Sequence, residues 1–195
     1  MYAVGSNGDP PTRRLTLNGA KLKWFKKVKH LGNFITFDLK DEADIGFKKG
    51  KFIGQVNKLL VKMSVVPATV RGRLLQTYCC SFHGAQAWDI GSQYVKQLNT
   101  EWNKAVRRVM RLPYKTHTRF LPYLVQGKPF NDQHFNRVAK FVKSFIVSKN
   151  VHVAFLGQRA RYSSTGSLGR NFTRCHEPNQ WLLNNDINSD DPVID

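Results

Sequence analysis

Apolar side chains recur every three or four positions through most of the chain, which is the spacing of one face of an α-helix. The clearest segment runs from 94 to 112, where the apolar and basic positions fall on nearly opposite sides. The apolar side comprises Val95, Leu98, Trp102, Ala105, Val106 and Val109, and the basic side comprises Lys104, Arg107, Arg108 and Arg111. We expect the helix to end near Arg111 and Leu112, because Pro113 lacks an N–H and disfavours helical geometry in the residue before it.

Three further segments show the same period. The first starts at Asp44, a plausible N-cap, and its apolar stripe comprises Ile45, Phe52, Ile53, Val56, Leu59, Leu60 and Met63. The second starts at Pro67, which suits a first helical turn, and its expected buried line comprises Val70, Leu74, Tyr78, Ser81, Ala85 and Trp88. The last runs from about Asn131 to Ser148, with Phe135, Val138, Ala139, Val142 and Ile146 inward and Arg137, Lys140 and Lys143 outward.

The amino end has a different pattern, typical of strands. Short apolar runs on either side of Asn18-Gly19 predict a hairpin, since both turn positions need positive φ. Residues 28–37 are the candidate for a third strand. After Gly157 the periodicity fades, which favours an irregular or disordered tail.

These patterns predict a mainly α protein with a small antiparallel β-hairpin or sheet at its amino end. The expected divisions are a loop at 1–14, the hairpin and strand at 15–37, a three-helix unit at 38–112, a helical connector at 113–157 and the irregular tail at 158–195.

The net charge of the chain indicates a helical domain that binds an anionic partner. The 195 residues carry a formal net charge of +18. All 31 Lys and Arg residues lie before His176, with 8 of the 13 acidic residues, so residues 1–175 carry 31 − 8 = +23. Such an imbalance causes self-repulsion that a nucleic acid or another polyanion relieves. The alternative interpretation of the basic helix face is an ordinary solvated surface.

Cysteine content and hydropathy bear on the cellular setting. Three cysteines, two of them adjacent, do not form a disulfide framework, which favours a reducing compartment. The first residues lack the pattern of a secretory signal, and no run approaches the roughly 20 apolar residues of a membrane span. We therefore expect a cytoplasmic or nuclear protein without a membrane partner.

Motifs for catalysis or metal binding are weak. The phosphate-binding patterns GxxxxGK[ST] and GxGxxG do not occur. Cys175-His176 has no second pair at zinc spacing, and the remaining histidines are scattered. The four acids from Asp38 to Asp44 suit the start of a helix and solubility better than a two-metal site. We expect no cofactor, no metal and no catalytic residue.

Several blocks nevertheless occur in a distinctive order. They are LNG at 17–19, KHLGN at 29–33, KGKFIGQVN at 49–57, YCCSFHG at 78–84 with Trp88, WNKAVRR at 102–108 and LPYKTH at 112–117. In this order, over roughly residues 15–150, they resemble the region after the catalytic palm in reverse transcriptases of LINE-type, non-LTR retrotransposons.

The resemblance implies a function for each part. The hairpin and the strand with Lys29, His30, Leu31 and Gly32 would form the palm–thumb junction that helps to hold the primer end. The following helices would be the thumb, which grips an RNA–DNA or RNA duplex without sequence preference. The basic residues that we expect on this thumb and its connector are Lys51, Lys58, Lys62, Lys104, Arg107, Arg108, Arg111, Lys115 and Arg119.

The chain also departs from the family. The Tyr-x-Asp-Asp signature of the metal-binding palm is absent, and Asp190-Asp191 follows Asn188-Ser189 in a polar stretch. Fingers, palm, endonuclease and the distal Cys/His knuckle are unmatched. Because polymerisation needs the palm metals, we do not expect the isolated chain to be an enzyme. Two alternatives remain: a free-standing basic nucleic-acid-binding or protein-interaction module derived from a retrotransposon, and a relic without function.

Overall fold

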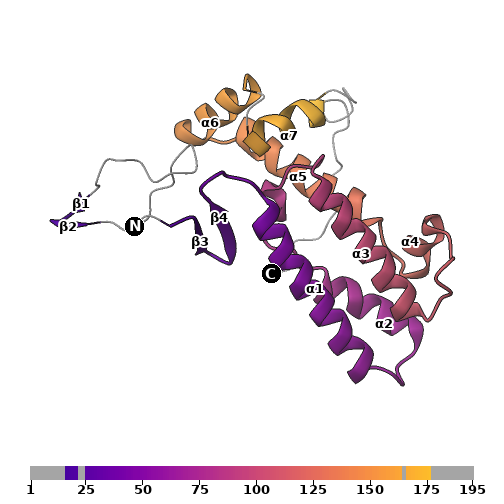
Figure 1. Ribbon diagram of the computed structural model, residues 1–195. Helices are drawn as coiled ribbons and strands as arrows, with labels where there is room; N and C mark the ends of the chain where they lie inside the picture. Colours follow the sequence, from indigo (N-terminus) through magenta and orange to yellow (C-terminus); the bar gives the residue numbers. More distant parts are fainter. Residues whose placement is uncertain (1–15, 22–24, 164–165, 177–195) are drawn as a thin grey trace.

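The computed structural model describes residues 16–21, 25–163 and 166–176 and is mainly helical, as the sequence predicts (Figure 1). The strands are β1 (Thr16–Leu17), β2 (Ala20–Lys21), β3 (Lys27–His30) and β4 (Asn33–Thr36). The helices are α1 (Glu42–Lys62), α2 (Ala68–Leu74), α3 (Gln93–Met110), α4 (Leu121–Leu124), α5 (Phe130–Ile146), α6 (Val151–Arg161) and α7 (Gly166–His176). The expected loop at 1–14 lies outside the described residues.

The first hairpin confirms the prediction from Asn-Gly. β1 pairs antiparallel with β2, and the two turn residues have φ values of 49° at Asn18 and 78° at Gly19. Both values lie in the left-handed region, where glycine and asparagine are least strained.

The expected single strand at 28–37 is wrong, because this segment is a second hairpin. β3 pairs antiparallel with β4, and the turn consists of Leu31 and Gly32 with φ values of 46° and 82°. Gly32 adopts positive φ readily, but leucine rarely does, so the residue type at position 31 concealed the turn. The segment containing Leu31 and Gly32 is therefore the tip of a hairpin and not the middle of a strand.

The main core lies between α1, α2 and α3. Figure 1 shows α1 and α3 side by side, and their contacts advance together along both helices, from Lys49 with Gln97 to Asn57 with Arg108, so the two run parallel. All six positions predicted as the apolar side of α3 are buried, and α3 ends at Met110, as expected. A clean 3.6-residue period was sufficient here because every inward position is apolar.

The start of α1 differs from the prediction. The N-cap is Asp41, while Asp44 lies inside the helix and is only 5% exposed. The Asp44 carboxylate accepts hydrogen bonds from the Phe34 N–H at 2.9 Å, the Trp88 Nε1–H at 2.8 Å and the Lys48 ammonium at 2.7 Å. This acid is therefore a buried link between the β3–β4 hairpin, α1 and the loop before α3, and not a solubility device.

The buried line predicted for the second helix is confirmed at Ala85 and Trp88, which are both buried, but it is out of phase over the helix itself. Val70 and Tyr78 are 44% and 66% exposed, whereas Arg71, Leu75 and Cys79 are buried. One cause is Arg71, a charged residue in an inward position that a hydropathy pattern cannot identify. The second cause is a π-helical turn at Leu75–Cys79, which shifts the register and ends the helix well before Trp88.

Arg71 is buried because its guanidinium satisfies backbone carbonyls. Its Nε donates to the Val109 carbonyl at 2.9 Å, and its Nη1 donates to the carbonyls of Val66 at 2.9 Å and Ser64 at 3.3 Å. These carbonyls lie in the last turn of α3 and just after α1, where helices have unpaired acceptors. The side chain therefore ties the loop after α1 to the end of α3.

The expectation of an irregular tail from 158 onward is wrong for most of the described part. The proposed boundary at 157 falls inside α6, and α7 forms a second core with α5, into which Phe172 and Cys175 are buried beside Val138 and Val142. α7 is short and contains two glycines, so its few large apolar residues gave too weak a pattern. Residues 177–195 lie outside the described residues.

Hydrogen bonds and ion pairs also connect α7 to residues 88–90, before α3. The Asn171 amide donates to the Trp88 carbonyl at 2.8 Å and accepts from the Ile90 N–H at 3.0 Å. Asp89 accepts hydrogen bonds from Arg170, at 2.6 Å, and from Arg174. Burial alone would raise the pKa of Asp89, but these arginines and the Gly91 N–H outweigh it and hold the pKa below its usual value. The carboxylate is therefore the ionised partner of two helix α7 cations.

None of the helices among the described residues has both the length and the apolar character needed to span a bilayer.

Candidate nucleic-acid interface

The exposed side of α3 and the segment after it carry a group of cations that we call the α3 basic face: Lys104, Arg107, Arg108, Arg111 and Lys115. Arg111 has left-handed backbone geometry, with φ at 56°, and its N–H caps the helix by donating to the carbonyls of Arg107 and Arg108. This C-cap reverses the chain, so that residues 113–117 return along the exposed side of α3. The reversal places the aromatic ring of Tyr114 beside the helix cations.

Arg107 fixes the returning segment. Its Nε and Nη2 both donate to the Thr116 carbonyl, at 3.1 and 2.9 Å, and its guanidinium carbon lies 5.9 Å from the centre of the Tyr114 ring. Lys115, between these two residues, is exposed. Arg107 therefore has a structural function as well as a charge, and replacing it would disturb the 113–117 segment.

The other cations on α3 have contacts that orient them without using all their donors. Arg108 donates to the Asn57 amide oxygen at 2.9 Å, and Arg111 donates to the Ser64 carbonyl at 2.7 Å. Lys104 forms an exposed ion pair with Glu101 at 2.9 Å, and the hydrogen bond that its ammonium donates to the Glu101 carboxylate raises the lysine pKa. A guanidinium has five N–H donors, so Arg108 and Arg111 each retain donors for an external anion.

Three of these cations surround one cavity. It has a volume of about 230 Å³ and is lined by Lys104, Arg107, Arg108, Leu112 and Tyr114. Glu101 is nearby, but it is paired with Lys104 and does not line this cavity. The cavity is therefore a positively charged recess with an apolar edge, which suits a phosphate group next to a sugar or base.

The structure does not bring Lys51, Lys58 and Lys62 to the same face. Residues 49, 53 and 57 are the positions of α1 that point toward α3, because Lys49 contacts Gln97, Asn57 contacts Arg108 and Ile53 lines a small cavity with residues of α3. At about 100° per residue, the three lysines lie roughly 160° around α1 from these positions. They form a separate basic surface on the far side of α1.

The residues expected at the primer-grip-like junction lie with this second surface. The Lys27 ammonium lies 4.0 Å from the centre of the Phe34 ring, and the Lys29 ammonium lies 5.0 Å from that of Phe47 on α1. Phe34 and Phe47 pack edge to face, with ring centres 5.0 Å apart, so the hairpin rests on α1. At its tip, His30, Leu31 and Gly32 are exposed.

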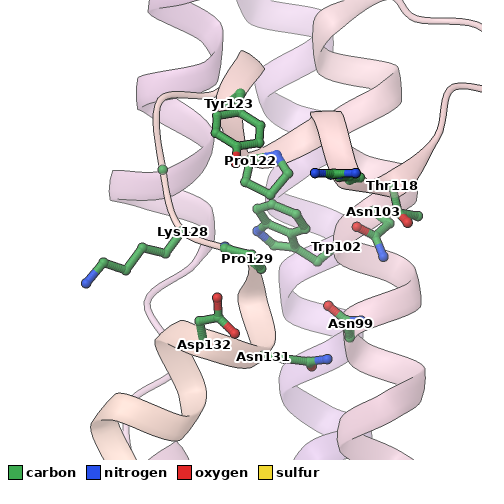
Figure 2. A pocket seen from close by; sticks show the side chains of 12 residues that line it. Asn99, Trp102, Asn103, Thr118, Pro122, Tyr123, Lys128, Pro129, Asn131 and Asp132 are labelled. Carbon is green, nitrogen blue, oxygen red and sulfur yellow. The ribbon is translucent and has the colours of Figure 1, made fainter.

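A second and larger hollow is lined in part by Thr118 and Arg119, which directly follow the 113–117 segment, so it includes the last predicted site residue, Arg119. Its volume is about 500 Å³, and Figure 2 shows side chains that reach it from α3, α4 and the start of α5. Three asparagines among them, Asn99, Asn103 and Asn131, were not found by sequence reasoning. The available signal was Asn99 and Asn103 at i and i+4 on α3, between its apolar and basic sides.

Burial is the main cause of the shifted pKa values of three buried cysteines and of His134. Burial raises the pKa of Cys80 to about 12 and also raises those of Cys79 and Cys175, so these thiols are poor nucleophiles. Burial, and secondarily the charge of Arg137, lowers the pKa of His134 to about 4. Within 16–21, 25–163 and 166–176, no three His, Cys, Asp or Glu residues are grouped to hold a metal.

Comparisons with known proteins do not identify a family: no protein-family model matches the chain, and searches of curated proteins and of solved structures gave no significant match. The resemblance to LINE-type reverse transcriptases is therefore supported by the ordered residue blocks alone.

Proposed function

We propose that this chain binds the phosphate backbone of duplex nucleic acid through the α3 basic face, as the thumb and connector fragment of a LINE-like reverse transcriptase. The observation that carries the proposal is the recess formed by Lys104, Arg107 and Arg108 in a region that bears a charge of +23 over residues 1–175. Arginine donates in a planar fork that matches phosphate oxygens, which makes a clustered arginine recess a better anion site than scattered lysines.

The dimensions of the face support this proposal. Lys104 and Arg111 are seven residues apart on one helix, which corresponds to about 10 Å along its axis. Each strand of B-DNA advances about 3.4 Å along the duplex axis per phosphate, so a face of this length that lies along that axis spans about three phosphates. Because phosphates carry no base identity, binding should show little sequence preference and a steep dependence on salt.

The isolated chain is proposed to bind without polymerising, since the family's palm aspartates are unmatched here. The second candidate is a free-standing basic module derived from a retrotransposon, which would use the same face. An in-frame palm sequence upstream of Met1 in the genome would favour the fragment, and an independent promoter with introns would favour the module.

The test removes two charges from each basic surface. Lys104→Ala with Arg108→Ala changes the α3 basic face and leaves the Arg107–Thr116 contact intact. Lys51→Ala with Lys58→Ala is the matched control, since it removes the same charge from the far side of α1. Binding to a blunt B-DNA duplex is measured by fluorescence anisotropy over a range of salt concentrations, and circular dichroism checks folding.

We expect the α3 pair to flatten the slope of log K against log salt by about 1.8, or about 0.9 for each lost phosphate contact, and the control to change it little. Equal losses from both pairs would mean that binding follows net charge and not a site. An unchanged slope in a folded Lys104→Ala, Arg108→Ala variant would show that the α3 basic face is merely solvated.

A further inference from the structure

The 500 Å³ hollow beside the α3 basic face differs from it in chemistry, and we call it the amide hollow. Its defining side chains are Asn99, Asn103, Asn131, Asp132, Trp102 and Tyr123. In Figure 2 the three asparagines lie along one side of the hollow, while Asp132 lies opposite them and Lys128 extends away. The hollow is therefore lined by neutral hydrogen-bonding groups and not by cations alone.

These polar groups are open to a ligand. In the part of the chain that the structure describes, no hydrogen bond engages the side chains of Asn99, Asn103 or Asn131. Asn99 and Asn103 are half-buried, so their amides are partly withdrawn from solvent. Each amide offers two N–H donors and a carbonyl acceptor to such a ligand.

The remaining walls suit a flat ring. Trp102, which is 1% exposed, closes the floor, and Pro122 is buried beside it. Tyr123 is 77% exposed at the rim, where its ring is available for stacking (Figure 2). An apolar floor, an aromatic rim and a few polar groups are the usual features of a pocket for a small aromatic ligand.

The position of the hollow selects the ligand class. Tyr114 lines the cationic recess, Thr118 and Arg119 line the hollow, and α3 contributes residues to both, so the two sites are neighbours. A neutral sugar or a peptide would gain nothing from these cations, whereas a nucleotide presents both a phosphate and a hydrogen-bonding ring. Asparagine pairs well with base edges, and a carboxylate such as Asp132 accepts from exocyclic amines of bases.

We propose that the amide hollow binds one unpaired base of the nucleic acid whose backbone lies on the α3 basic face. The inference rests on the proposed function and adds to it a contact that depends on base chemistry. A base inside a duplex cannot reach the hollow, so the contact requires an overhang, a bulge or a single strand. Stacking on Tyr123 and pairing with the amides together hold the ring.

The experiment compares two DNA probes, a blunt duplex and the same duplex with a short single-stranded overhang that carries 2-aminopurine. The full chain, the Asn99→Ala, Asn103→Ala variant and a control variant are measured against both. The control is Gln97→Ala with Thr100→Ala, which removes two polar side chains from another side of α3.

We expect the full chain to bind the overhang probe about tenfold more tightly than the blunt probe, in line with the stacking of a single base. The asparagine variant should lose this difference while its affinity and salt slope for the blunt duplex stay unchanged. The control should retain the difference. Tyr123→Leu should also reduce the fluorescence change of 2-aminopurine on binding.

Two outcomes would overturn the inference and can be told apart. If the full chain binds both probes equally, or if the asparagine variant keeps the preference, the amide hollow does not bind a base, and the backbone proposal is unaffected. If the full chain fails to bind the blunt duplex, the proposed function fails and the inference fails with it.

Discussion

Replacing Asp44 by alanine should destabilise the fold more than replacing any exposed acid, because this carboxylate joins three elements. It accepts from the Phe34 N–H, the Trp88 indole and the Lys48 ammonium, at 2.7 to 2.9 Å. Lys48 itself is 7% exposed and also donates to the Asn33 amide oxygen. Removing the carboxylate therefore leaves a buried cation without its counter-charge, and it leaves the buried Trp88 indole N–H and the partly buried Phe34 N–H without an acceptor.

The expected cost follows from the size of these losses. Breaking a buried ion pair by removing one partner costs about 3–5 kcal/mol, because the remaining charge stays in a poorly solvated place. We therefore expect Asp44→Ala to lower the free energy of unfolding by about 4 kcal/mol, a large part of the 5–15 kcal/mol typical of a domain. Asp38→Ala is the control: its ion pair with Lys40 is exposed, so the change should be within about 0.5 kcal/mol.

The assay is urea unfolding followed by tryptophan fluorescence, and a double-mutant cycle with Lys48→Met makes it specific. In the wild-type background Lys48→Met should destabilise, since it leaves Asp44 buried without its cation. In the Asp44→Ala background the same substitution should be neutral or stabilising by about 1 kcal/mol, because it removes the orphaned charge. If Lys48→Met has the same sign and size in both backgrounds, the two residues are not coupled and the reasoning is refuted.

Three other predictions concern the buried core residues Phe172 and His134 and the hydrogen bonds of Arg71. Phe172→Ala should cost about 3–5 kcal/mol in denaturant unfolding, since this ring is 1% exposed between α5 and α7, whereas Phe120→Ala, at a 57% exposed position, should cost less than about 1 kcal/mol. The free energy of unfolding should decline as pH falls from about 6.5 to 4, because the folded state holds His134 neutral with a pKa of about 4 while the unfolded state takes up the proton. The maximum loss is about 3 kcal/mol. Thermal unfolding measured across this pH range should show no such decline for His134→Leu. Arg71→Ala should cost about 3 kcal/mol by urea unfolding, because the carbonyls of Val66 and Val109 lose a charged donor; a cost under about 1 kcal/mol would mean that water replaces it.

The sequence predicted elements well where one physical signal acted alone. The apolar side of α3 was correct at every position because its period is unbroken and Pro113 limits its end. The buried positions of the second helix were predicted wrongly because Arg71 is buried for its hydrogen bonds and not for its hydropathy. The second hairpin was not predicted because Leu31, in its turn, adopts a backbone conformation that leucine rarely takes. α7 was missed because a short helix with two glycines gains its stability from α5 and not from its own sequence.

The candidate site was predictable only in part for a geometrical reason. The cations on α3 share one helix face, so their clustering follows from the sequence alone. Whether Lys51 joins them depends on which side of α1 meets α3, and that is decided by packing. The amide hollow combines Asn99 on α3 with Asn131 on α5, and no pattern within one segment brings them together.

The parallel arrangement of α1 and α3 gives the α3 basic face a direction. Both helices end in the same region, so the negative ends of two macrodipoles lie close together there. Arg71 and Arg111, which both donate to the Ser64 carbonyl, neutralise part of that negative field. The attraction available to a phosphate is therefore weaker near Arg111 than a count of cations suggests, and it grows toward Lys104 and Arg108. A bound backbone should be held most firmly at that end of the face and should detach first at the end nearest Arg111.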